Sequence, residues 1–317
     1  MSAVDFLVLL ISLAFLAKSA EIVINSSARL AAFFGISHIA LGFVLLSTAT
    51  SLPELSVSVV SSAVENGAIA AGNIFGSNTA DILLVLGIGA SLYRIRIERK
   101  EIEDVALILL GTSVITLAII YLVGLGRIEG TLLLALFTAY VLYLARRRMP
   151  SDAGERVAKS EALRAFLWFG AGIAVVLVSA GFVVGSAVRL AEAFGLAKSF
   201  IGATIIALGT SLPELTLDLQ ALRTRRYGLA LGDALGSSMT NITLVLGVAA
   251  LLNPIIVNMQ VFMPIVLSSL IANLILFYFI STRRALGRRE GLLMVAVYLL
   301  FLLVVSGAQL LARGRAL

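Results

Sequence analysis

Two copies of a single motif are the residues best suited to chemistry in this sequence. They stand 160 positions apart, as Thr50-Ser51-Leu52-Pro53-Glu54-Leu55 and Thr210-Ser211-Leu212-Pro213-Glu214-Leu215. Each copy lies inside a strongly apolar stretch. A carboxylate is costly in such surroundings and usually marks an ion or proton path. The repeat therefore predicts two matched, buried glutamates that bind ions or protons.

The proline of each copy predicts a break in the helix around it. Pro53 and Pro213 have no N–H and clash with the carbonyl four residues earlier, so backbone oxygens there lose their helical partners. Hydroxyl side chains flank each break, namely Thr50, Ser51, Thr210 and Ser211. Each glutamate follows its threonine by four residues and shares its helix face. Carbonyl, hydroxyl and carboxylate oxygens together suit hard cations such as Ca²⁺ or Na⁺.

A second polar stripe follows each motif at helical spacing. Its members are Asn73, Ser77 and Asp81 in the first half, and Asp233, Ser237 and Asn241 in the second. We expect Asn73 and Asp233 to cap helices or bridge them. Asp81 and Asn241 lie deeper at matched positions, and we expect them to belong to the ion site. Glycines beside the stripe permit another break or a close helix crossing: Gly72, Gly76, Gly232 and Gly236.

The composition is that of a polytopic membrane protein. Of the 317 residues, 60% are hydrophobic and 13% are charged, whereas a soluble domain has about 25% charged residues. The absence of Cys and the single His, His38, exclude thiolate and multi-histidine metal centres. The basic residues behind the net charge of +6 cluster in short loops, which argues against a nucleic-acid partner. Without a Ser/His pairing or a phosphate-binding loop, we expect neither an enzyme nor a bound cofactor.

Ten segments are apolar enough to cross a membrane, since one span needs roughly 20 apolar residues. They are approximately 4–34, 38–64, 68–92, 104–124, 129–146, 163–194, 198–222, 228–252, 256–281 and 291–312. Five segments per half is an odd number, so the second half must enter the membrane upside down, as an inverted-topology repeat. The expected organisation is a first repeat at 1–145, a cytoplasmic linker at 146–162 and a second repeat at 163–317.

The distribution of basic residues predicts the orientation of the spans. Alternate loops on one side hold 17 Lys and Arg residues, and the loops and terminus on the other side hold 4. By the positive-inside rule the basic side is cytoplasmic. We therefore expect a multi-pass protein of the cell membrane with both termini outside.

These motifs resemble the sodium/calcium exchanger family, within the wider cation/Ca²⁺ exchangers. The string from Gly209 to Glu214 and the Gly-Asn-x-x-Gly-Ser-Asn string from Gly72 to Asn78 look like that family's two alpha-repeat signatures. The corresponding motif regions are 42–87 and 202–247. The match is closest to compact prokaryotic members, and it implies Na⁺/Ca²⁺ antiport by alternating access. The fold class that we expect is all-α, with broken helices 2, 3, 7 and 8 forming the ion-binding core.

The resemblance also implies a set of ion ligands. Glu54 and Glu214, with Thr50 and Thr210, resemble the central Ca²⁺ ligands. The family's flanking Na⁺ ligands have as their counterparts, by this resemblance, Ser51, Ser77, Ser211 and Ser237, with backbone carbonyls at Ser47 and Ala207. Asp81 and Asn241 match the polar pair beside the central site. The implied substrates are Ca²⁺ and Na⁺, and the sequence indicates no obligate protein partner besides the lipid bilayer.

One departure from the family pattern affects the charge of the site. Well-known exchangers of this type carry the amide in the first repeat and the acid in the second, and Asp81 and Asn241 reverse that order. Glu54, Glu214 and Asp81 carry three negative charges when ionised, which three Na⁺ would neutralise. One Ca²⁺ leaves one charge over and favours protonation of Asp81. We therefore expect about three Na⁺ per Ca²⁺ and one net charge moved per cycle, worth roughly 2.3 kcal/mol per 100 mV.

Other functions remain open from the sequence. An acid at position 81 is compatible with K⁺-dependent Na⁺/Ca²⁺ exchange or H⁺/Ca²⁺ exchange, although the first repeat lacks the Gly-Asn-x-x-Glu pattern of proton-coupled members. An uncoupled cation channel is a different class. For alternating access the long first and sixth segments would slide over the core. Gly170, Gly172, Gly181 and Gly185 give the sixth segment a smooth side, and a packing role for these glycines is equally consistent.

Overall fold

Helices make up nearly all of the chain that the computed structural model describes. The described residues are 3–34, 42–63, 67–96, 99–121, 124–146, 158–193, 207–256, 259–283 and 285–314. Helical stretches long and apolar enough to cross a membrane are Ala70–Leu92, Lys159–Ser179, Tyr227–Leu252, Phe262–Arg283 and Arg288–Gly307. The protein is therefore a helical, multi-pass membrane protein.

The elements of the two sequence halves follow the same order. The first half contains α1 (Ala3–Phe34), the π-helical η1 (Gly42–Leu46), α3 (Ser47–Thr50), α4 (Leu52–Ala63), α5 (Gly67–Ala80), the π-helical η2 (Asp81–Val85), α6 (Leu86–Leu92), β1 (Ile95–Arg96), α7 (Arg99–Tyr121), β2 (Gly124–Leu125) and α8 (Arg127–Arg146). The second half contains α9 (Lys159–Ala193), α11 (Ala207–Thr210), α12 (Leu212–Arg223), α13 (Tyr227–Thr240), the π-helical η4 (Asn241–Val245), α14 (Leu246–Leu252), β3 (Ile255–Ile256), α15 (Met259–Arg283), β4 (Ala285–Leu286) and α16 (Arg288–Gly314). From α3 to β3 the matched elements start 160 residues apart wherever both are described.

The helices lie close to the spans expected from hydropathy, with two exceptions. Positions 124 and 256 were expected at helix ends, and both lie in two-residue strands. Gly124 and Pro254 explain the difference, because neither residue type continues a helix well. Residues 147–157 of the expected linker, and the starts of the second and seventh spans, lie outside the described residues.

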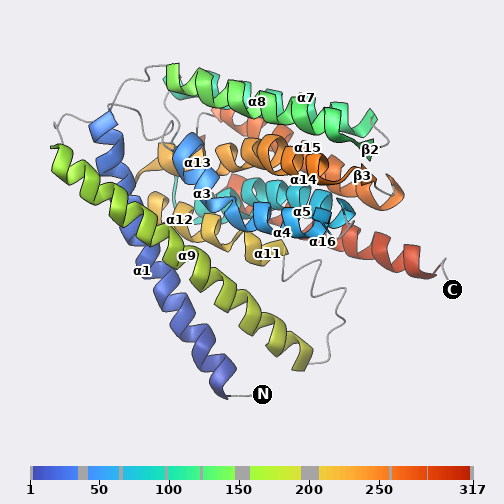
Figure 1. Ribbon diagram of the computed structural model, residues 1–317, viewed down its shortest axis with the longest axis horizontal. Helices are drawn as coiled ribbons and strands as arrows, with labels where there is room; N and C mark the ends of the chain where they lie inside the picture. The colour runs from blue at the N-terminus through green and yellow to red at the C-terminus, as the bar shows by residue number, and fades with distance from the viewer. Residues whose placement is uncertain are drawn as a thin grey trace. The chain divides into compact units, whose positions relative to one another are not determined.

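The chain forms two compact units, and each takes segments from both sequence halves. The first unit comprises residues 1–52 and 147–233, and the second comprises 53–146 and 234–317. In the first unit α1 and α9 pack along each other in opposite directions (Figure 1). A Cβ on Gly172 of α9 would lie 2.7 Å from the Val23 side chain of α1, whereas Gly170 and Gly181 have no described neighbour within 4 Å. Gly172 is therefore a packing contact between these two helices.

The second unit is built around α5, α14 and α15. Its buried cluster includes Ile74, Phe75, Leu246 and Phe262, and the two phenylalanine rings meet edge to face at 5.6 Å. Two antiparallel ribbons join helix ends within this unit. One pairs Ile95 of β1 with Leu286 of β4, and the other pairs Leu125 of β2 with Ile255 of β3.

Two glycine crossings hold helices of the second unit close together. A Cβ on Gly291 of α16 would lie 2.5 Å from the carbonyl oxygen of Gly87 on α6. In the second crossing, a Cβ on Gly130 of α8 would lie 2.8 Å from the carbonyl oxygen of Gly247 on α14. Only glycine tolerates such backbone approach. The close crossing expected at Gly232 is present, because a Cβ on Gly42 of η1 would lie 2.9 Å from the Gly232 Cα on α13. Gly72 and Gly76 have no described neighbour within 4 Å of their Cβ positions.

Candidate ion-binding site

Both copies of the repeated motif form the same local break. Helix α3 ends at Thr50 and α4 begins at Leu52, and the Ser51 between them has φ −77° and ψ 6°. Ser211 has φ −86° and ψ 7° between α11 and α12. A ψ near 0° is far from the helical value of about −42°. The break that proline predicts is confirmed in both copies, with Pro53 and Pro213 in the first turn of the following helix.

The oxygens of the first break point toward one another. The Ser47 carbonyl accepts a hydrogen bond from the Ser51 N–H at 3.0 Å. The Thr50 hydroxyl lies 3.2 Å from that carbonyl and also 3.2 Å from Oδ1 of Asp233 on α13. One hydroxyl hydrogen cannot serve both acceptors at once. Asp233 therefore bridges α13 to α3, as expected from the sequence, and leaves this turn rich in oxygen acceptors.

Among the described side chains, three buried carboxylates belong to the first unit. Glu214 lies in the first turn of α12, where the helix dipole favours negative charge. Asp218 follows one turn later on the same helix, and its carboxyl interacts with that of Asp233. Asp218 was not predicted as a site residue. A signal was present, because it is an acid four residues after Glu214 in an apolar helix, at the position matched by Ser58.

The second unit holds the other glutamate and the deeper polar residues. Ser77 of α5 donates a hydrogen bond to Oε1 of Glu54 on α4 at 3.3 Å. The Asn241 side-chain amide donates to Oδ1 of Asn78 at 3.1 Å, and the Asn78 amide donates to the Ser238 carbonyl at 3.2 Å. These bonds join α5 to α13 and η4. Asn78 was part of the family signature but was not predicted as a site residue.

The helices do not break at Asp81 and Asn241 but widen into π-helical turns. The Leu86 N–H bonds to the Asp81 carbonyl, and the Leu246 N–H bonds to the Asn241 carbonyl, both across five residues. Single π turns are rare in α-helices, and those that occur often lie at functional sites. The breaks expected in the third and eighth helices are therefore wrong, because α5 continues into α6 and α13 into α14 through matched π turns that begin at the predicted acid and amide.

Burial is shared by all predicted ligands whose side chains are described. The most exposed is Thr210, at 8%, and the rest are Ser47, Thr50, Ser51, Glu54, Ser77, Asp81, Ser211, Glu214, Ser237 and Asn241. Ala207 starts α11, and its side chain lies outside the described set. The described residues bring together no group of three or more Asp, Glu, His or Cys side chains. Hydroxyl and carbonyl oxygens must therefore complete any cation site, which favours hard cations.

Comparison with known proteins identifies the family. Residues 4–146 and 164–307 match the family described as sodium/calcium exchanger protein. The inner membrane protein YrbG of Escherichia coli is 32% identical over 78% of this chain and 79% of its own. The sodium/calcium exchanger MaX1 of Methanosarcina acetivorans is 28% identical over 96% of this chain and 99% of its own.

Solved structures agree with the sequence relatives. The sodium-calcium exchanger NCX_Mj, soaked with zero Na⁺ and Ca²⁺, is 28% identical and superimposes with a TM-score of 0.83, covering 95% of this chain and 98% of that one. The same protein soaked with 2.5 mM Na⁺ and 1 mM Sr²⁺ gives a TM-score of 0.82. The matched breaks, the buried acids and these similarities agree: the chain belongs to the sodium/calcium exchanger family.

Proposed function

We propose that this chain is an antiporter that exchanges Na⁺ for Ca²⁺ across the membrane. One observation carries the proposal, namely the two copies of a broken helix that each present a buried glutamate beside threonine and serine oxygens. Burying a carboxylate is costly unless a cation, a proton or hydrogen bonds compensate it. A transported cation compensates it reversibly. Membership of the exchanger family supports this function.

Glu54 and Glu214, with Thr50 and Thr210, are the proposed ligands of Ca²⁺. The proposed Na⁺ ligands are Ser51, Ser77, Ser211 and Ser237, with the carbonyls of Ser47 and Ala207. Ca²⁺ and Na⁺ compete for overlapping oxygens, with about three Na⁺ exchanged per Ca²⁺ and one charge moved per cycle. The Ser77 hydroxyl already donates to Glu54, so an ion that binds this carboxylate replaces or adjusts that bond.

The proposed topology is ten helices in two inverted five-helix repeats, in the cell membrane, with both termini outside. The recurrence of the elements at a spacing of 160 residues supports the repeat. The opposed directions of α1 and α9 support its inversion (Figure 1). Alternating access would proceed by movement of α1 and α9, and the contact between Gly172 and Val23 would keep these two helices together as they move.

A second candidate is H⁺/Ca²⁺ exchange, and the pair Asp218 and Asp233 is the observation that favours it. Two buried carboxyl groups that interact are stable together when they share a proton. The charge count that gives about three Na⁺ per Ca²⁺ uses Glu54, Glu214 and Asp81 only. A proton held by Asp218 and Asp233 would be additional to it. Potassium dependence is a further variant, because the sodium/potassium/calcium exchanger 1 of Mus musculus is 28% identical over 37% of this chain.

The test is radiocalcium uptake into proteoliposomes loaded with Na⁺ and diluted into Na⁺-free or Na⁺-containing buffer. We expect uptake that requires the outward Na⁺ gradient. A pH gradient imposed without Na⁺ distinguishes H⁺/Ca²⁺ exchange from Na⁺/Ca²⁺ exchange. Uptake driven by the pH gradient alone would show that the protein couples Ca²⁺ to H⁺ and not to Na⁺. Flux that needs no counter-ion would identify a channel instead.

A further inference from the structure

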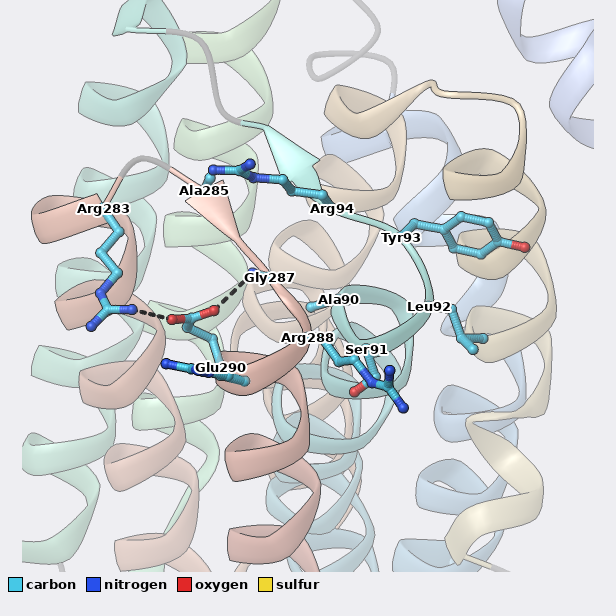
Figure 2. A pocket seen from close by; sticks show the side chains of 11 residues that line it. Ala90, Ser91, Leu92, Tyr93, Arg94, Arg283, Ala285, Gly287, Arg288 and Glu290 are labelled. Carbon is cyan, nitrogen blue, oxygen red and sulfur yellow. Dashed lines mark hydrogen bonds and ion pairs between the residues drawn. The ribbon is translucent and has the colours of Figure 1, made fainter.

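A basic cavity lies in the second unit where three helices end, and it contains none of the proposed ion ligands. Helix α6 ends at Leu92, α15 ends at Arg283 and α16 begins at Arg288. The cavity between these ends has a volume of about 620 Å³. Figure 2 shows Arg94, Arg283 and Arg288 on different sides of it, with Arg94 carried by the segment that leads into β1.

Four arginines line the cavity, and Glu290 is the single acid among the lining residues that the structure describes. Arg283 donates to Glu290, whose other oxygen accepts the Gly287 N–H at 3.0 Å (Figure 2). The acid is therefore engaged in capping α16 and in one ion pair. Arg94, Arg288 and Arg289 remain as a cationic lining, and all three side chains are exposed. Guanidinium groups bind phosphate oxygens in a bidentate manner and are weakly hydrated.

The sequence-related end of the second unit carries less of this charge, since of Arg94, Arg288 and Arg289 only Arg288 has a basic match there, Arg127. There Glu129 accepts the Gly126 N–H at 2.8 Å and caps α8 in the same way. Yet the positions matching Arg94 and Arg289 are Pro254 and Ile128. The backbone arrangement of ribbon, cap and glycine crossing therefore does not require Arg94 and Arg289, which are present at one end only.

The surroundings of the cavity favour a lipid over a free anion. Leu92, which lines the cavity, is 65% exposed, and Leu292 and Leu293 on the first turns of α16 are exposed as well. A ligand held here would meet cationic groups at one end and apolar side chains at the other. The loops that carry the arginines are on the side that the basic-residue count assigns to the cytoplasm, where anionic lipids concentrate. We propose that this cavity binds the phosphate headgroup of an anionic phospholipid.

This lipid site goes beyond the exchange function and does not depend on it. The test is native mass spectrometry of the purified full-length protein titrated with phosphatidylglycerol in detergent. We expect one tightly bound lipid in the wild-type protein. In the triple variant Arg94→Gln, Arg288→Gln, Arg289→Gln its affinity should fall by about a hundredfold, since each of the three arginines near an anionic lipid contributes about a fivefold step.

A matched control removes the same charge elsewhere. Lys159→Gln, Arg164→Gln, Arg223→Gln also replaces three exposed basic side chains and should leave the lipid bound. Equal affinity in the wild-type protein and the cavity variant would overturn the proposal, as would an equal loss in the control. Displacement of the lipid by millimolar inorganic phosphate would assign the cavity to free phosphate and overturn the choice of a lipid.

Discussion

The two polar stripes, on α5–η2 and on α13–η4, have the same backbone conformation and differ in which of their side chains are charged. Both helices enter a π turn at the third stripe position, Asp81 in one and Asn241 in the other. At the first position the order is reversed, with Asn73 matched by Asp233. The second half adds Asp218 where the first has Ser58. The backbone conformation is therefore repeated in the two halves, whereas the positions of the acidic side chains are not. The two halves need not contribute equally to ion coupling.

The largest effect should come from the residues that the halves hold in common. Glu54→Gln and Glu214→Gln keep the size of each side chain and remove its charge. Loss of one partner from a buried ionic set costs about 3–5 kcal/mol, so each variant should lose more than about a hundredfold in Na⁺-driven Ca²⁺ uptake. Initial uptake rates in proteoliposomes measure it. A normal rate in either variant would show that the halves are not equivalent at this position.

The repeated shape can be tested at its closest contacts. Gly291→Ala forces a Cβ against the Gly87 and Ser91 backbone at 2.5 Å, whereas Gly130→Ala meets the Gly247 carbonyl at 2.8 Å. Overpacking costs about 1–3 kcal/mol, so both variants should unfold at lower temperature in detergent, and Gly291→Ala should be the lower. Gly72→Ala, with no described neighbour within 4 Å of its Cβ position, is the control. Wild-type stability in Gly291→Ala would contradict the crossing.

The acid and the amide at positions 81 and 241 can be exchanged by mutation. Asp81→Asn removes one negative charge from the second unit, and Na⁺ should activate Ca²⁺ uptake about tenfold less effectively. The double variant Asp81→Asn, Asn241→Asp restores the total charge in the order found in well-known exchangers and should recover most of the Na⁺ response. The Na⁺ concentration for half-maximal uptake is the readout. A double variant as impaired as the single one would mean that position, and not total charge, decides coupling.

The smallest effect is expected from the acids special to the second half. Asp218→Asn combined with Asp233→Asn keeps both side-chain sizes and an acceptor for the Thr50 hydroxyl, so Na⁺-driven uptake should change by less than about threefold. The measurement is uptake with an imposed Na⁺ gradient and, separately, an imposed pH gradient. If uptake is driven by the pH gradient in the wild-type protein and this variant loses it, the pair carries proton coupling.

Much of the shared backbone could be predicted from the repeated motif alone. Pro53 and Pro213 act through local sterics, so the breaks at Ser51 and Ser211 could be placed without tertiary structure. The π turns at Asp81 and Asn241 could not, because no residue type marks them. The two-residue strands were too short to show an alternating pattern.

Other features that were not predicted had a signal in the sequence. Leu125-Gly126-Arg127-Ile128-Glu129-Gly130 and Leu286-Gly287-Arg288-Arg289-Glu290-Gly291 form a second repeat, 161 residues apart. It encodes a ribbon end, a cap and a crossing glycine, and each of these is present in both copies. The partners of these glycines, Gly87 and Gly247, could not be assigned, because contacts between distant segments depend on packing.

Calcium binding to the purified protein tests the central claim most directly, because it asks whether Glu54 and Glu214 hold one ion together. Isothermal titration in Na⁺-free buffer should give one Ca²⁺ per wild-type chain, displaced by Na⁺, and no binding in either Glu54→Gln or Glu214→Gln. Retention of one Ca²⁺ with unchanged affinity in either single variant would contradict a shared site and, with it, the proposed exchange of Na⁺ for Ca²⁺ at the paired glutamates.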